Sequence, residues 1–491
     1  MGKLKTFLLI SFLAFFSSCE KSINDIVTQS DNLLAEVGEK KIMVNDFIKR
    51  CEYVPRPTYC RGNNYIHKKI ALNSLIAEKM FAIEFEKNNL ILSESQKYLI
   101  QGQKEQGMRQ LMLKRFGFDL VNIDFDEIKR LASLSKRTYS IKFITVDQNF
   151  SNLIKKRLGN SNLEKIIKKL NLNIKISKKR LTKNEDMIKG IHQILYSGEP
   201  IKNKIYGPFN FNNIETLYFE IEGWKTKVDV TEKQKKETWT IVEKDYREKF
   251  ALKYYSEFVK KIMRGKKITY NVKSFEEFSN KLRKIYLIEK EKKEAVINNE
   301  IWDIKENTEL LSFKDIKKNK DDILLTHDNK TYTIANLLDL VRKHPLVFRN
   351  KKTSEKLFSN ELKYAIADLL RDFHITEKAY ELRLEKNKTV TQIEQKWEDH
   401  IKSTIFKNQY FNLEKSNELL FNNTTMQVDS LQKVYSKVIN IDTDKFKKIS
   451  LSTIDMNVNY SNQAYSKLEP SFPVLTNDHI LDYGKKVKFG E

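Results

Sequence analysis

Glycine and proline are scarce in this chain, with 14 glycines and 7 prolines among 491 residues. Glycine supplies the backbone freedom that phosphate-binding loops and tight catalytic turns need, so the sequence has little material for either. No glycine-rich phosphate loop, HExxH, GxSxG or paired-cysteine metal motif occurs. The common signatures of nucleotide, zinc-peptidase and serine-hydrolase sites are therefore missing, and we expect neither a metal nor a cofactor.

Histidine is also rare, and its positions show no ligand spacing. The seven histidines are His67, His192, His327, His344, His374, His400 and His479. We expect each of them on the surface or satisfied in the core, without a catalytic role. Glu377 and Glu381 lie in a lysine-rich helical segment, which favours a solvated face. We assign no catalytic residue.

The charge is strongly positive, with 89 Lys and Arg against 65 Asp and Glu, a net charge of +24. The excess is lysine spread over the whole length, and there is no arginine-rich arm. This pattern predicts a solvated lysine-rich surface and no nucleic-acid partner, with weak attraction to anionic lipid or acidic segments as the alternative. Hydrophobic residues make up 40% and aromatic residues 11%, as in a folded protein.

The first 19 residues have the pattern of an export signal. Lys3 and Lys5 precede an apolar run over 7–16, which is too short to span a bilayer. Ser17, Ser18 and Cys19 resemble a lipobox, although Phe16 stands where leucine is commoner. The resemblance implies a signal peptide over 1–18, an acylated Cys19 and a tether over 19–32. We expect a periplasmic lipoprotein anchored in a membrane, the outer one by preference; an ordinary secretory signal is the alternative.

Only two further cysteines are present, Cys51 and Cys60, nine residues apart around Pro55-Arg56-Pro57. In an exported protein a disulfide could close this short loop, and two unpaired thiols are the alternative.

Hydrophobic periodicity predicts a helical framework that is interrupted by an α/β module. In 33–48 a short strand or turn precedes a helix that Asn45 or Asp46 would cap. Apolar spacing predicts helices over 67–88, 93–116 and 124–134. The module has strand patterns at 139–146, 173–176 and 216–221, and helix patterns at 152–158, 163–170 and 184–196.

A long helix follows the module and begins with a capping box over 231–234. It ends near Gly265, before a closing strand at 268–271. Its apolar face carries Trp239, Val242, Tyr246, Phe250, Tyr254 and Phe258. We expect this face to be a core or docking face.

The second half repeats the order of the first, which predicts an internal duplication. The segment 324–337 resembles 33–47, and 361–384 resembles the helix of 67–88. A capping box at 391–394 opens a helix with a stripe of Ile393, Trp397, Ile401 and Ile405. The segment 438–442 repeats the closing strand. The last 40 residues show no readable pattern.

Several segments, taken in order, resemble the SurA-like and PrsA-like foldases, which combine helical chaperone domains with parvulin-type peptidyl-prolyl isomerase modules. The resemblance lies in Ala35-Glu-Val-Gly-Glu-Lys-Lys-Ile-Met-Val-Asn-Asp-Phe47, in Leu75-Ile-Ala-Glu-Lys-Met80, in 137–146, and in Gly198-Glu199, Gly207-Pro208 and 217–221. It covers 33–275. It implies an α+β, mainly α, fold with SurA-like helical domains and one inserted parvulin-like module.

The resemblance also implies domain boundaries. The expected parts are a helical chaperone segment over 33–135, a parvulin-like module over 136–228, a long helix with closing strand over 229–280 that completes the first chaperone domain, a second SurA-like helical repeat over 281–450, and a tail over 451–491.

The departures from the family bear on its chemistry. Parvulins carry a histidine in the first strand, a second in the last strand, and a Gly-Gly loop. Here Lys142 and Tyr218 occupy the two histidine positions, and the loop is absent between Lys178 and Gly190. Rotation of an X-Pro bond has a barrier of about 20 kcal/mol, so we expect a module without the grip residues to be inactive.

The expected function is therefore that of a lipid-anchored periplasmic holdase for unfolded or partly folded envelope proteins, outer-membrane proteins among them. An active proline isomerase and a lipoprotein scaffold of an envelope assembly or secretion complex are the alternatives. Whether the chain is an enzyme stays open on the sequence alone.

Overall fold

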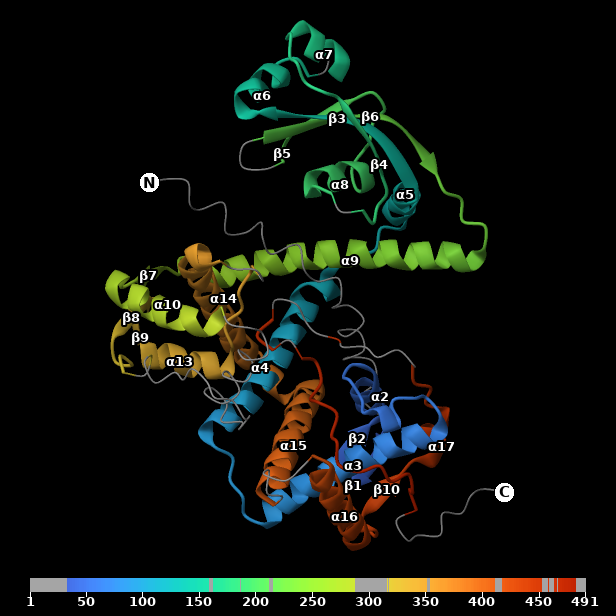
Figure 1. The fold of residues 1–491 in the computed structure, drawn as a ribbon, viewed down its shortest axis with the longest axis vertical. Coiled ribbons are helices and arrows are strands. Elements are labelled where there is room, and N and C mark those ends of the chain that lie inside the picture. The colour runs from blue at the N-terminus through green and yellow to red at the C-terminus, as the bar shows by residue number, and fades with distance from the viewer. Residues whose placement is uncertain are drawn as a thin grey trace. The chain divides into compact units, whose positions relative to one another are not determined.

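The computed structural model describes most of the chain after residue 32. The described residues are 33–158, 162–185, 187–211, 215–287, 316, 318–350, 354–410, 417–452, 458, 463–465 and 467–482. They form a mainly helical α+β protein with three small antiparallel sheets (Figure 1). The expected signal peptide, the tether and Cys19 lie outside these residues.

The chain divides into two compact units. One comprises the described residues up to Gly117 and from Tyr254 onward, and the other comprises those of Phe118–Lys253. The helices of the first, larger unit are α2 (Val44–Glu52), α3 (Tyr65–Lys87), α4 (Glu94–Phe116), the end of α9 (Glu232–Met263), α10 (Val272–Tyr286), α13 (Ile334–Lys343), α14 (Glu355–Glu381), α15 (Lys388–Tyr410), α16 (Asn417–Tyr435) and α17 (Thr443–Lys448). The helices predicted over 67–88, 93–116 and 361–384 correspond to α3, α4 and α14.

The larger unit contains two three-stranded sheets, and in each of them a hairpin pairs with a third strand from another part of the chain. β1 (Leu33–Val37) and β2 (Lys40–Met43) form a hairpin whose third strand is β10 (Ile439–Ile441). β8 (Ile323–His327) and β9 (Lys330–Thr333) form a second hairpin whose third strand is β7 (Ile268–Tyr270). The closing strand expected to complete the first chaperone domain thus pairs with the hairpin of the second half. The last strand, in turn, completes the first hairpin.

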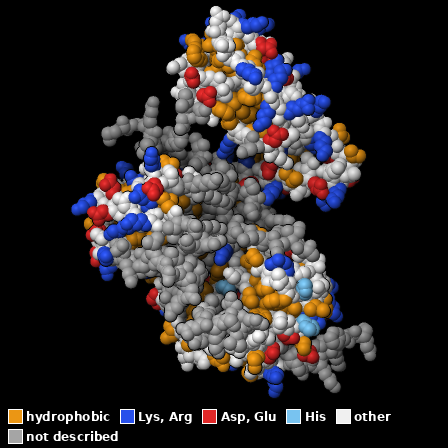
Figure 2. Space-filling view, viewed as in Figure 1, with side chains coloured by type: hydrophobic (Ala, Val, Ile, Leu, Met, Phe, Trp, Pro, Cys, Tyr) orange, Lys and Arg blue, Asp and Glu red, His pale blue; other side chains and the backbone are white. Residues whose placement is uncertain are grey.

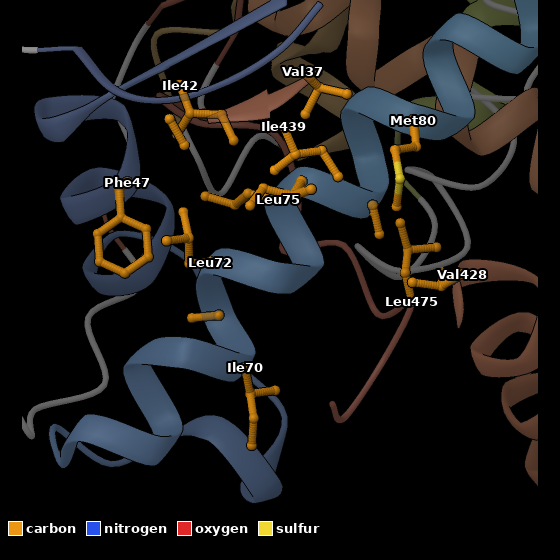
Figure 3. Packing of buried hydrophobic residues seen from close by; sticks show 14 of the residues in the cluster. Val37, Ile42, Phe47, Ile70, Leu72, Leu75, Met80, Val428, Ile439 and Leu475 are labelled. Carbon is orange, nitrogen blue, oxygen red and sulfur yellow. The ribbon is translucent and has the colours of Figure 1, made fainter. Parts of the chain in front are cut away.

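Among the described residues, the apolar core around α3 combines side chains from the first and the last described parts of the chain. Val37 of β1 and Phe47 of α2 pack with Leu72 and Leu75 of α3 and with Ile439 of β10 (Figure 3). A second core lies between α10, α13 and α14 under β8. The hairpin that begins the described chain therefore shares its core with the strand near its end.

α3 differs from its expected form, an amphipathic helix with one apolar stripe. Polar side chains on its other faces are buried as well, among them Glu78 and Lys79. Glu78 accepts hydrogen bonds from Arg50 (2.8 and 3.1 Å) and from His400 (2.8 Å), and Lys79 donates to Asp399 (2.8 Å). Buried charges persist where opposite charges satisfy them, so α3 lies in the middle of the unit.

Two predicted helix caps lie inside their helices. Met43 is the N-cap residue of α2, and Asn45 and Asp46 belong to its first turn. α15 begins at Lys388, before Thr391, and the side chain of Asn387 accepts a hydrogen bond from the Thr389 N–H (2.9 Å). In both cases the chain enters the helix earlier than the polar pattern predicts.

The smaller unit is an α/β layer around a four-stranded antiparallel sheet, with strand order β4-β3-β6-β5. Its elements are α5 (Phe125–Ser135), β3 (Arg137–Asp147), α6 (Gln148–Lys155), α7 (Leu163–Lys169), β4 (Ser177–Leu181), α8 (Lys189–Tyr196), β5 (Ile205–Asn210), β6 (Glu215–Thr226) and the start of α9. The strand expected at 173–176 lies at 177–181 instead, because Ile174 and Ile176 pack among the apolar side chains of α6 and α7.

α5 and the start of α9 belong to this smaller unit, which is larger than the module expected over 136–228. Ile128 of α5 packs with Val242 and Tyr246 of α9, flanked by Trp239 and Phe250. The capping box expected for this helix is present, since Thr231 and Gln234 exchange side chain to backbone hydrogen bonds. Tyr254, expected on the same face, is 39% exposed.

Candidate functional site

The sheet of the smaller unit brings together Lys142 and Tyr218, the two residues that the sequence resemblance places at parvulin histidine positions. β3 and β6 are its two central strands and pair in register, with Lys142 opposite Glu220 and Ile144 opposite Tyr218. Directly opposed residues share a face of a sheet, as do residues two apart along a strand. Lys142 and Tyr218 therefore lie on the same face, the one that α6 and α7 cover.

Tyr218 is fully buried among Ile144, Val146 and Ile154. Its hydroxyl lies 2.8 Å from Ser151 Oγ and donates to the Ser151 carbonyl (3.0 Å). Both hydrogen-bonding roles of the phenol are thus used to hold α6 against the sheet.

Gly207 makes room for this ring. A Cβ at Gly207 would lie 2.5 Å from Tyr218 Cδ1, and its φ of +144° disfavours other residues.

Lys142 is held in a small ion-pair network. Its Nζ lies 2.9 Å from Glu164 Oε1 and 3.2 Å from Glu222 Oε1, and Lys178 reaches the same oxygen of Glu222 at 3.1 Å. Hydrogen bonds to Glu164 and Glu222 raise the pKa of Lys142 above its ordinary value. Lys142 is therefore charged at neutral pH and has no free electron pair with which to act as a base or nucleophile.

The carboxylates of this face are engaged as well. The hydrogen bond from Lys142 lowers the pKa of Glu164. Burial raises the pKa of Glu222, but hydrogen bonds from Lys178 and Lys142 outweigh it and leave that pKa below its ordinary value. The buried Glu220 accepts a hydrogen bond from the Leu163 N–H (2.9 Å) at the start of α7. Each carboxylate thus anchors a neighbouring element, and the lowered pKa values of Glu164 and Glu222 keep these two out of the protonated form that a general acid needs.

Apolar side chains are exposed at one end of this sheet. Phe150 and Leu153 on α6 are 40% and 44% exposed, and Phe211 after β5 is 52% exposed. Asp147, just before α6, lies opposite Glu215, and Phe211 N–H bonds to the Glu215 carbonyl (3.0 Å). Phe211 and the start of α6 therefore lie near the same end of the sheet.

The two cysteines are free and buried. Burial raises the pKa of the Cys51 thiol to about 12 and that of Cys60 to about 11. Both thiols are protonated at neutral pH, so neither is a reactive nucleophile.

Metal sites and membrane spans can be assessed in the part of the chain that the structure describes. Within it, no group of three or more His, Cys, Asp or Glu side chains is placed to hold a metal ion. None of its helices is long and apolar enough to cross a membrane. On the face drawn in Figure 2, the Lys and Arg side chains that are visible are spread among acidic and apolar ones.

Sequence reasoning missed the buried polar groups of the larger unit. Glu78 meets Arg50 and His400, which lie 28 and 322 residues away in the chain. Such distant partners leave no local spacing signal, so nothing short of the fold itself could identify them.

Comparison of the chain with protein-family models, with curated proteins and with solved structures gives no match.

Proposed function

We propose that this chain is a lipid-anchored envelope chaperone, a holdase that resembles the SurA-like foldases, and that its α/β unit does not isomerise proline. The observation that carries the proposal is the state of the two family positions. Lys142 is charged and ion-paired, and Tyr218 is buried with its hydroxyl bonded to Ser151. Side chains whose hydrogen-bonding and charge interactions are all made within the unit are not available to contact a substrate.

Isomerisation of an X-Pro bond needs an apolar, desolvated grip on the proline and its twisted amide, because the barrier is about 20 kcal/mol. The face around Lys142 instead presents two carboxylates and two lysines within 3.2 Å of their partners. A charged, hydrated network of this kind does not favour proline binding.

The apolar side chains at the edge of the same unit support a holding function. Phe150, Leu153 and Phe211 remain exposed although the unit has its own well-packed cores. Exposed apolar groups that gather at one edge are typical of surfaces that bind other chains. The clients would be unfolded or partly folded envelope proteins, and Cys19 would tether the chain at a membrane, the outer one by preference.

An aggregation assay tests the holding function. The purified chain should suppress the light scattering of a urea-unfolded outer-membrane protein when that protein is diluted into buffer. Replacing Phe150, Leu153 and Phe211 together by serine should weaken the suppression, because it removes apolar contact area. The matched control replaces the exposed Asn152 and Lys155 of the same helix by alanine and should leave suppression unchanged. A chain that never suppresses scattering would refute the proposal.

A protease-coupled proline assay tests the other half. In the presence of the chain, the protease should cleave the proline peptide no faster than it does when isomerisation is uncatalysed. A clear acceleration that is lost on deletion of residues 137–225 would establish the active isomerase instead.

A further inference from the structure

Residues 467–482 form a segment, here called the C-terminal strap, that lies in the larger unit without regular structure. From Leu468 to Asp482 it has no helix or strand. It is nevertheless firmly packed: Phe472 is 6% exposed, Leu475 3% and Thr476 0%. An irregular segment that is so deeply buried needs partners for its backbone.

The burial of the strap repeats every three residues. Ser471, Val474 and Asn477 are exposed, and the two residues between successive members of this series are buried. A polyproline II helix has about three residues per turn and no internal hydrogen bonds, so one of its edges faces outward at this interval. Pro470 and Pro473 are both in buried positions and favour that extended conformation.

Side chains of the helices bind the main chain of the strap. The donors lie on α2, α3 and α15: Arg50 donates to the Ser471 carbonyl (2.7 Å), Lys407 to that of Val474 (3.2 Å), and Ser74 to that of Thr476 (3.3 Å). Further along, the Asn73 amide donates to the carbonyls of Asp478 and Ile480, each at 2.9 Å. All of these bonds are accepted by main-chain carbonyls, which every polypeptide has. They require no hydrogen-bond donor from the segment that lies on this surface.

The side chains of the strap enter apolar and charged positions of the same surface. Leu475 lies beside Val428 near Met80 of α3, as Figure 3 shows, and Phe472 joins the same core. At the other end, Glu469 accepts a hydrogen bond from Lys396 (2.9 Å). Glu469, Phe472, Leu475 and Asp478 are spaced by three, so the contacts follow the period of the burial.

We propose that this surface, defined by Arg50, Asn73, Ser74, Lys396 and Lys407, is a binding site for extended, proline-containing polypeptide, and that the strap is its built-in occupant. Its partner is a segment of an unfolded chain in polyproline II conformation, with an acidic residue followed by two apolar residues at intervals of three. The inference rests on the proposed holding function and names the surface that recognises clients. A client segment binds when the strap leaves.

A labelled peptide tests the site directly. The probe is a synthetic fluorescent peptide with the sequence of residues 467–482, titrated against the full chain and against the full chain carrying Phe472→Ser and Leu475→Ser. The strap competes with the peptide at a high effective concentration, so weakening it should tighten peptide binding by about tenfold or more.

Two controls accompany this titration. Val474→Ser with Ile480→Ser changes two exposed strap residues (40% and 56% exposed) and should leave the peptide affinity at that of the unchanged chain. A peptide in which serine replaces both buried apolar residues should not bind. A double variant that keeps its circular dichroism and binds the peptide no more tightly than the unchanged chain overturns the proposal.

A second measurement does not depend on weakening the strap. In the full chain with Thr476→Cys, a thiol reagent should modify the introduced thiol faster than Cys51 and Cys60, which are buried in the same unit and report its global opening. Peptides from a protease digest identify which thiol reacted. Equal rates for all three thiols would show that the strap is a permanent part of the core and would overturn the proposal.

The result also separates the site from the proposed function. Peptide binding and fast labelling without suppression of aggregation would leave the site standing and refute the holding function. Suppression of aggregation without either would keep the function and refute the site.

Discussion

Val37 of β1 lies directly opposite Ile439 of β10, and both side chains are buried in one core. The pairing of Ile268 in β7 with His327 in β8 is its counterpart in the other sheet of the larger unit. Each three-stranded sheet is thus completed by a strand from the other half of the chain. Because such contacts join distant segments, the N-terminal hairpin cannot complete its core until the C-terminal strand is available.

Replacing Ile439 by alanine should test this shared core. Ile439 is 3% exposed, so its loss should lower the free energy of unfolding by about 2–5 kcal/mol. Val438→Ala, one residue away and 43% exposed, is the control and should change it by less than about 0.5 kcal/mol. Urea unfolding followed by circular dichroism measures both. Equally small effects would mean that β10 does not belong to the core.

The sequence predicts the elements of this fold well and their pairing poorly. Local periodicity locates α3, α4, α14 and both hairpin regions, because helix and strand periods are properties of neighbouring residues. It cannot tell whether 268–271 pairs with the hairpin before it or the one after it, since both have similar apolar residues. α10, which the aromatic pair Phe275 and Phe278 anchors in the second core, also escaped prediction.

The candidate site shows the same division. The strands that carry Lys142 and Tyr218 could be predicted from their alternating apolar pattern. Their partners could not: Glu164 and Ser151 come from helices whose packing depends on the whole sheet. The strap could not be predicted for a related reason, because its three-residue burial period is neither a helical nor a strand period.

The core between α5 and α9 can be tested inside the smaller unit. Ile128 is fully buried there, so Ile128→Ala should lower the free energy of unfolding of this unit by about 2–5 kcal/mol. Trp239 flanks the same cluster, and its fluorescence reports the transition. Ile241→Ala, at a position that is 57% exposed, should shift the free energy of unfolding by less than about 0.5 kcal/mol. A negligible effect of Ile128→Ala would contradict the packing of α5 on α9.

The proposed anchor predicts how the chain partitions. With Cys19 acylated, the chain should enter the detergent phase of a detergent-partition experiment. Cys19→Ala removes the acylation site and should move it to the aqueous phase. Cys60→Ala is the control, because Cys60 is buried in the larger unit, and should partition like the unchanged chain. Detergent-phase recovery of the Cys19→Ala chain would refute the lipid anchor.

His400 should make the stability of the larger unit depend on pH. Its Nδ1 lies 2.8 Å from Glu78, and burial beside Arg50 lowers the pKa of His400 below its ordinary value despite the hydrogen bond to Glu78. The folded chain therefore binds fewer protons than the unfolded chain as the pH falls past about 6.5, the ordinary pKa of histidine.

The contribution of His400 to stability is complete above that pH and is lost as the pH falls through the folded pKa. Urea unfolding should show a smaller loss between about pH 7.5 and 5.5 for His400→Gln than for the unchanged chain, because glutamine can donate to Glu78 without titrating. His479→Gln, at an exposed position, controls for the loss of a histidine and should keep the original loss. An unchanged loss in His400→Gln would show that other groups of this unit, among them His374, whose pKa burial also lowers, set the pH dependence.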